Sequence, residues 1–254
     1  MKEKFDICGV GVSAINLEKA ADMIHEWIRS KYKAYVCVAP VSTIVDCQKD
    51  EIYRNIVNQA DMVTPDGMPV VWVARSKGFR EVSRTYGPDL MLLISDVGQQ
   101  RGYRHYFYGG NQETCTLLFN TLKEKFPQIN VVGHFSPEKV SLDYEEKKEV
   151  LDCINNAHAD ILWIGLGSPK QDYWMFHHRA RLNVPVMIGV GAAFDFLSGQ
   201  KKQAPRWMQK SGIEWLFRLC SEPKRLWKRY LIGNTLFIYF LIRSFLQKNN
   251  TSNL

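Results

Sequence analysis

The stretch "ADMVTPDGMPVVW", residues 60–72, joins two apolar runs through the turn Thr64-Pro65-Asp66-Gly67. Pro-Asp-Gly after a short apolar run is typical of the end of a strand, and the Met-Pro-Val-Val-Trp run that follows favours the start of a helix. Because open α/β sheets bind ligands at the carboxyl ends of their strands, Asp66 is a candidate ligand-binding residue. A purely local role is the alternative, since aspartate also serves turns and caps helices.

The same alternation of strand and helix patterns continues along most of the chain. Apolar, strand-like runs occupy residues 5–10, 34–39, 60–64, 104–109, 129–135, 159–167 and 184–191. Amphipathic helices are expected at 17–31, 41–59, 68–78, 88–101, 111–126, 143–156 and 169–181. This order predicts an α/β fold, with a mostly parallel, Rossmann-like sheet flanked by helices. The pattern becomes purely helical after Gly199, so we expect an α/β domain over 1–199 and a helical C-terminal appendage over 200–254.

Composition indicates a folded protein of a reducing compartment. The chain has 254 residues, of which 46% are hydrophobic, enough for a sizeable core. Its six cysteines are widely spaced, lie mostly in apolar segments and form no C-x-x-C pair, which predicts buried thiols. The first apolar run is short and broken by Asp6, unlike a signal peptide. We therefore expect a cytoplasmic protein.

The C-terminal segment carries the positive charge. From residue 200 onward there are eleven basic residues and two acidic ones, together with Trp207, Trp215 and Trp227. The apolar run 230–246 is interrupted by Asn234 and Arg243, and it is too short to span a bilayer. Basic and aromatic residues beside such a run favour a helix at a membrane surface. A basic helix packed on the protein's own body and a nucleic-acid patch are the alternatives, and we expect no nucleic-acid partner.

Three further loops combine glycine with polar residues between a strand and a helix. There, backbone N–H groups can approach a phosphate or a ribose closely. Glycine geometry alone explains any single loop, but three loops at one sheet edge favour a nucleotide-type ligand. The candidate residues are Gly109, Gly110 and Asn111, then Gly167, Lys170 and Gln171, and finally Gly191 and Asp195.

Several familiar kinds of site are excluded. Residues 9–14, "GVGVSA", match the outline of a dinucleotide fingerprint, but the next strand runs into Ala39-Pro40 without the acidic residue that holds a ribose. The sequence contains no P-loop motif, no G-x-S-x-G elbow, no histidine spacing of a metal site and no Asp-x-Asp clamp. We therefore expect neither a cofactor nor a bound metal.

Six ordered stretches carry a family resemblance over residues 5–230. They are "ADMVTPDGMPVVW", "SRTYGPDLM", "YFYGGN", "GLGSPKQDYW", "GVGAAFDFLSG" and "APRWMQKSGIEWLFRLCSEPKRLWKRY". This set resembles the WecG/TagA/CpsF family of bacterial glycosyltransferases, family 26. The resemblance implies an inverting enzyme that transfers N-acetylmannosamine or a related sugar. The donor would be a UDP-sugar and the acceptor a saccharide linked to undecaprenyl diphosphate, at the cytoplasmic face of the membrane, for wall polymer, capsule or exopolysaccharide synthesis.

The resemblance also implies roles for particular residues. Asp66 would be the general base, because an acceptor hydroxyl must lose its proton as it attacks the anomeric carbon. Arg84, Gly110 and Gln171 would lie near the donor, with Lys170 adding charge, since arginine is suited to phosphate. A surface ion pair of Arg84 with Asp89 is the alternative. The cations that would meet the lipid diphosphate, or else form a solvated basic face, are Arg218, Arg225 and Arg229.

The resemblance departs at residues 38–45, "VAPVSTIV", where many members carry an asparagine after the second strand. Ser42 or Thr43 is the candidate replacement that holds the donor or the acceptor. A regulator that binds nucleotides or saccharides at the membrane without catalysis is the alternative function. Association into a homo-oligomer is left open.

Overall fold

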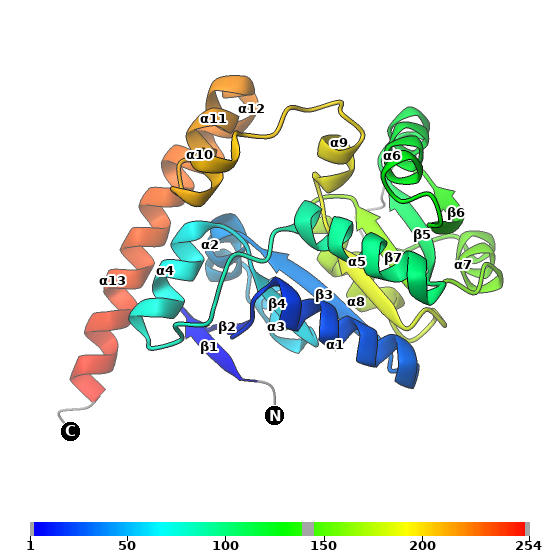
Figure 1. Cartoon of the computed structure of the whole chain (residues 1–254). Helices are drawn as coiled ribbons and strands as arrows, with labels where there is room; N and C mark the ends of the chain where they lie inside the picture. Colours follow the sequence, from blue (N-terminus) through cyan, green and yellow to red (C-terminus); the bar gives the residue numbers. More distant parts are fainter. Residues whose placement is uncertain (1–2, 139–144, 252–254) are drawn as a thin grey trace.

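The computed structural model describes residues 3–138 and 145–251, and within them one six-stranded parallel sheet forms the centre (Figure 1). Its strand order is β4-β3-β8-β7-β5-β6. The strands are β3 (Ala34–Ala39), β4 (Met62–Pro65), β5 (Arg104–Gly109), β6 (Asn130–Phe135), β7 (Ile161–Gly165) and β8 (Val186–Gly189). The predicted α/β fold with a mostly parallel sheet is confirmed.

Helices cover both faces of this sheet. In β3, Tyr35 and Cys37 belong to one buried cluster and Ala34 and Val36 to the other, so alternate residues serve opposite faces. One cluster includes residues of α2 (Val41–Lys49), α3 (Glu51–Gln59), α4 (Met68–Ser76), α7 (Lys148–Asn156) and α8 (Lys170–His178). The other includes residues of α1 (Leu17–Ser30), α5 (Gly87–Arg101), α6 (Gln112–Lys125) and α9 (Ala193–Leu197).

The N-terminal strand prediction was wrong in one respect. Residues 5–10 do not form a single strand of the main sheet, because the chain reverses at Cys8 and Gly9, which have φ of 52° and 81°. The result is an antiparallel hairpin of β1 (Lys4–Ile7) and β2 (Val10–Ser13), separate from the parallel sheet. The glycines that outlined a dinucleotide fingerprint therefore belong to a hairpin.

Smaller differences concern two helices and two cysteines. The helix expected over 41–59 is divided at Asp50, whose side chain accepts a hydrogen bond from the Tyr53 backbone and caps α3. The start of the helix expected over 143–156 lies outside the described residues, and α7 begins at Lys148. Burial of the thiols was predicted wrongly for Cys153 and Cys220, which are exposed on α7 and α11.

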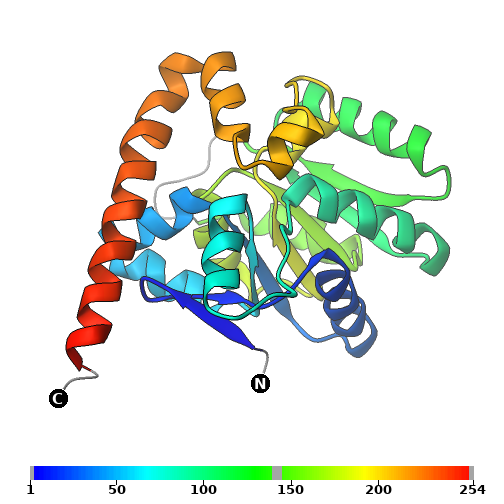
Figure 2. The ribbon, with the colours of Figure 1, turned by 60° about the vertical axis from the view of Figure 1, so that its left-hand side comes forward.

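The segment after residue 199 forms α10 (Arg206–Lys210), α11 (Glu214–Ser221), α12 (Pro223–Trp227), the π-helical turn η1 (Lys228–Ile232) and α13 (Gly233–Thr251). Figure 2 shows α13 as one long helix along the side of the molecule, where it packs against α2. Phe237 of α13 is buried in the same hydrophobic cluster as residues of α2. None of the described helices combines the length and the hydropathy needed to cross a bilayer.

A buried hydrogen bond fixes α8 against α3. The Tyr53 hydroxyl donates to Oδ2 of Asp172 at 2.6 Å, and both side chains are fully buried. Burial raises the pKa of Asp172 to about 6, while the bond from Tyr53 opposes this increase. The position of α8 matters for function because the neighbouring residue, Gln171, holds two loops of the site described below.

We expect Tyr53→Phe to lower the free energy of unfolding by about 1.5–3 kcal/mol at pH 8, where the buried Asp172 is ionised. The native pKa of Asp172 lies above its unfolded value, so ionisation costs stability as the pH rises through about 6. Without the Tyr53 hydroxyl, ionisation of Asp172 costs more stability. The decrease in unfolding free energy caused by Tyr53→Phe should therefore be smaller at pH 5 than at pH 8. Urea unfolding at the two pH values measures it. Tyr173→Phe is the matched control, because its hydroxyl bonds the exposed Asp50, and an equal loss there would contradict the assignment.

Candidate active site

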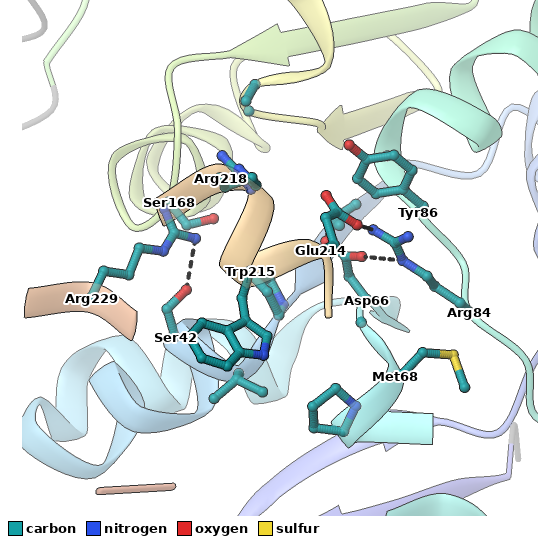
Figure 3. Close-up of a pocket in the computed structure, with 18 of the residues that line it drawn as sticks. Ser42, Asp66, Met68, Arg84, Tyr86, Ser168, Glu214, Trp215, Arg218 and Arg229 are labelled. Carbon is teal, nitrogen blue, oxygen red and sulfur yellow. Dashed lines mark hydrogen bonds and ion pairs between the residues drawn. The ribbon is translucent and has the colours of Figure 1, made fainter. Parts of the chain in front are cut away.

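A cavity of about 1110 Å³ lies over the carboxyl ends of four neighbouring strands, β4, β3, β8 and β7. Loops that follow these strands form one part of its wall, and residues of α10, α11, α12, η1 and α13 form another. The predicted residues that line it are Ser42, Asp66, Arg84, Gly167, Gln171, Gly191, Asp195, Arg218, Arg225 and Arg229. Figure 3 shows several of these side chains directed toward one another.

Asp66 is placed by the turn at the end of β4. Its backbone N–H donates to the carbonyl of Ala39 at 3.3 Å, and Gly67, with φ of 89°, then lets the chain enter α4. The cap of α4 is Gly67 and no side chain bonds the helix end. Helix capping therefore does not account for the Asp66 carboxylate, which instead accepts a hydrogen bond from Nε of Arg84 at 3.2 Å.

Every nitrogen of the Arg84 guanidinium group has a partner, and Figure 3 shows the contacts with Asp66 and Glu214. Nε contacts Asp66, Nη2 pairs with Glu214 at 2.6 Å, and Nη1 donates to Gln209 at 3.2 Å. The ring of Tyr86 stacks against the same group at 3.9 Å. Arg84 thus links the end of β4 to α10 and α11.

The short segment before α5 positions Arg84. Thr85 donates its backbone N–H to the carbonyl of Pro65 at 2.9 Å, so this segment runs beside the end of β4. The alternative pairing of Arg84 with Asp89 is excluded, because Asp89 pairs with Arg206 at 2.9 Å.

Burial and charge act together in this network. Burial works against the charge of Arg84, but the carboxylates of Asp66 and Glu214 raise its pKa above the ordinary value. Burial raises the pKa of Glu214, and the nearby Arg84 partly opposes the increase. The positive charge of Arg84 therefore offsets the desolvation cost of two carboxylates, those of Asp66 and Glu214.

The side chain of Gln171 connects two loops of the site. Its Oε1 accepts hydrogen bonds from the backbone N–H groups of Gly167 at 3.2 Å and Gly191 at 2.9 Å, and its Nε2 donates to Ser168 at 3.2 Å. The side chain is only 2% exposed. Gln171 therefore fixes the loops that follow β7 and β8 relative to each other.

Two arginines of the cavity have no carboxylate partner among the residues that the structure describes. Arg229 donates from Nη2 to Ser42 at 2.8 Å, and Arg218 lies over the ring of Phe196 at 5.3 Å. Both come from the C-terminal segment, on η1 and α11. An anionic ligand in the cavity would meet these two charges without first displacing a protein carboxylate.

The remaining predicted arginine of the C-terminal segment, Arg225, pairs at 2.6 Å with Glu222, the N-cap residue of its helix α12. Lys201 also lines the cavity and pairs with the predicted residue Asp195 at 2.6 Å. These charges are therefore neutralised within the protein.

Five predicted residues do not line the cavity. Strand β5 is the fifth in the sheet order, beyond the four whose ends the cavity covers, and this separates its loop from Asp66. Thr43 is buried in α2 and Lys170 is exposed at the start of α8. The residues outside the lining are Thr43, Gly109, Gly110, Asn111 and Lys170.

The glycine loop after β5 has local structural functions. A Cβ atom on Gly109 would lie 2.7 Å from the backbone of Gly165 on the neighbouring strand, so only glycine fits there. Asn111 accepts a hydrogen bond from the Thr114 backbone at 2.7 Å and caps α6. For metals, no cluster of three or more His, Cys, Asp or Glu side chains occurs within residues 3–138 and 145–251.

Comparison with known proteins identifies the family. The model of the glycosyl transferase WecG/TagA/CpsF family matches residues 5–251. The chain belongs to this family. Family membership confirms the resemblance seen in the sequence motifs and identifies the protein as a glycosyltransferase, in preference to a regulator without catalysis.

Three curated relatives carry the name N-acetylglucosaminyldiphosphoundecaprenol N-acetyl-beta-D-mannosaminyltransferase. The protein of Bacillus spizizenii is 30% identical over 78% of this chain and 75% of its own length. That of Bacillus subtilis is 28% identical over 85% and 82%. That of Staphylococcus aureus is 26% identical over 88% and 87%.

The sequence reasoning missed Glu214 and Gln209, which complete the contacts of Arg84. Both lie in the stretch "WMQKSGIEW", residues 207–215, which carried part of the resemblance. Glu214 is one of only two acidic residues after position 199, in a segment of otherwise basic charge. An acidic residue in this basic segment is the sequence signal from which Glu214 could have been predicted.

The Arg84 network predicts non-additive stability changes. Arg84→Gln leaves two carboxylates, each only 14% exposed, without compensation and should cost about 3–5 kcal/mol of unfolding free energy. Adding Glu214→Gln to that variant removes one of the uncompensated charges and should restore part of the loss. Urea unfolding of both single variants and the double variant gives the coupling.

The control cycle uses Arg206→Gln and Asp89→Asn, an exposed ion pair that also joins the C-terminal segment to α5. Its coupling should stay below about 1 kcal/mol. A double variant at Arg84 and Glu214 that is no more stable than Arg84→Gln would refute the shared compensation.

Proposed function

We propose that this glycosyltransferase transfers N-acetylmannosamine or a closely related sugar from a UDP-sugar to N-acetylglucosamine on undecaprenyl diphosphate, with inversion, in cell-wall polymer synthesis. One observation carries the proposal: Asp66 lines the same cavity as Arg218 and Arg229, which have no carboxylate partner within residues 3–138 and 145–251. The names of the relatives from Bacillus and Staphylococcus supply the sugar and the acceptor.

Asp66 is the proposed general base. Arg84 contacts Oδ1, whereas Oδ2 of Asp66 accepts no hydrogen bond from the described residues. A free carboxylate oxygen in the cavity is able to take the proton from an acceptor hydroxyl while that hydroxyl attacks the anomeric carbon. Attack from the side opposite the leaving group gives inversion at that carbon.

Cations are the proposed stabilisers of the diphosphate groups. As the bond to the sugar breaks, negative charge grows on the leaving UDP, and preorganised donors lower the energy of that charge. Arg218 and Arg229 offer planar guanidinium forks that match phosphate oxygens. Arg84 has a different task in this proposal: it orients Asp66 and stays paired with Glu214.

The test is turnover of UDP-N-acetylmannosamine with a short-chain N-acetylglucosamine diphosphate lipid, read by product mass. Asp66→Asn keeps the shape of the side chain but its amide does not accept the proton, so kcat should fall about 100-fold or more. The affinity for UDP, measured by calorimetry, should change by no more than a few-fold. Wild-type turnover by Asp66→Asn would disprove the base, and absence of product from the wild-type enzyme would disprove the reaction.

We further propose that residues 200–254 act as an appendage that attaches the enzyme to the cytoplasmic face of the cell membrane. Its net positive charge suits anionic lipid. On α13 the side chains of Tyr239, Ile242, Phe245 and Leu246 are more than half exposed, which is unusual for neighbouring apolar residues of one helix. Such a surface fits an interfacial helix.

Point variants test this attachment better than truncation, because the segment also supplies Glu214, Arg218 and Arg229 to the cavity. The double variant Ile242→Ser/Phe245→Ser should lose most binding to vesicles that contain anionic lipid, and wild-type binding should weaken as salt increases. Sedimentation with the vesicles measures both. The matched control is Ile52→Ser, an exposed apolar residue on α3. Vesicle binding by the double variant that equals that of the control would contradict the proposal.

A further inference from the structure

The cavity continues from its polar end into an apolar region between two helices. Along α13 the lining residues include Asn234, Phe237, Ile238 and Leu241, a spacing that places them on one face of the helix. The face therefore runs along two turns, about 10 Å, away from Arg229.

Helix α4 contributes a matching face. Pro69, Trp72, Val73 and Ser76 line the same cavity, whereas Val70 and Ala74 on the other side of the helix are buried in the core. This face also extends for about 10 Å, and it leads away from Asp66. Both helices thus begin at the polar end of the cavity and then present mainly apolar side chains to it.

We call this region the apolar trough and define it by Pro69, Trp72, Val73, Phe237, Ile238 and Leu241. Trp72 is 51% exposed and Ile238 57% exposed, although both are large apolar side chains that line a cavity. Contiguous apolar surface of this kind marks an interaction site. The cavity of about 1110 Å³ also exceeds the usual range for one small ligand, about 300–1000 Å³.

The polar end determines which apolar ligand fits. Five basic and three acidic side chains line the cavity. Arg229, which has no carboxylate partner among the described residues, donates to Ser42 and precedes the start of the trough on α13. An anion held by Arg229 would therefore have its attached group directed along α13. The complementary ligand is a diphosphate ester with a hydrocarbon chain.

We propose that the apolar trough binds the first isoprene units of the acceptor's polyprenyl chain. The proposal rests on the proposed function, in which that acceptor carries a diphosphate between its sugar and its lipid. The enzyme then recognises three parts of one substrate: the sugar near Asp66, the diphosphate at Arg218 and Arg229, and the beginning of the lipid between α4 and α13. The remainder of the chain stays in the membrane.

The test compares acceptors in a vesicle-free and detergent-free assay. All carry the same N-acetylglucosamine diphosphate, esterified with a methyl group, one isoprene unit or two isoprene units, below their aggregation concentrations. For the wild-type enzyme, kcat/KM should rise by at least about tenfold from the methyl ester to the longest ester, mainly through KM. This ratio is the measured quantity.

Variants locate the effect. Trp72→Ser and Ile238→Ser should reduce the ratio to about one, and two variants on different helices guard against the failure of either one to fold. Ile52→Ser is the matched control, because Ile52 is an exposed isoleucine like Ile238, 68% against 57%, but lies on α3 and does not line the cavity. It should keep the wild-type ratio.

The outcomes separate the two proposals. Turnover of every ester with a wild-type ratio of about one overturns the trough and leaves the proposed function intact. An equal loss of the ratio in Ile52→Ser and Ile238→Ser also overturns the trough, because the gain then reflects general hydrophobic association. No turnover of any ester overturns the proposed function itself.

Discussion

The shared ion pair of Arg84 with Asp66 and Glu214 is the constraint on which the site depends. The three residues come from the end of β4, the segment before α5 and the start of α11, so the pair joins the sheet to the C-terminal helices. A buried carboxylate that loses its partner is costly. The C-terminal helices therefore cannot leave the cavity without disturbing the electrostatic environment of Asp66. The position of these helices and the charge environment of Asp66 are thus coupled.

Most of the fold was predictable because strands buried on both faces read as short apolar runs bounded by turns. Each of the six strands of the parallel sheet coincides with a run predicted from the sequence, apart from Pro65, by which β4 extends beyond its predicted run. The errors arose where one run contains two elements. Cys8 and Gly9 reverse the chain inside an apolar run, and Asp50 ends one helix while it caps the next. Hydrophobic periodicity reveals neither a chain reversal inside an apolar run nor a break between two consecutive helices.

The site was predictable to the extent that its residues follow a strand. Asp66 is marked by its turn, and the glycines after β7 and β8 by theirs, and all line the cavity. The loop after β5 has the same local signature, but three strands separate β5 from β4 in the sheet. The sequence of a single loop does not reveal the order of the strands. Glu214 was missed for a related reason, since its partner Arg84 lies 130 positions earlier in the chain.

The π-helical turn η1 sets the rotation of the last helix about its own axis. Each residue of a regular α-helix advances by about 100°, and a π turn interrupts this progression. Helix α13 has apolar residues on more than one side, Phe237 and Leu241 toward the cavity and Tyr239 and Leu246 on the opposite, exposed side. Composition alone would not decide which side faces inward. The π-helical turn Lys228–Ile232 therefore determines which side of α13 faces the protein and which side faces its surroundings.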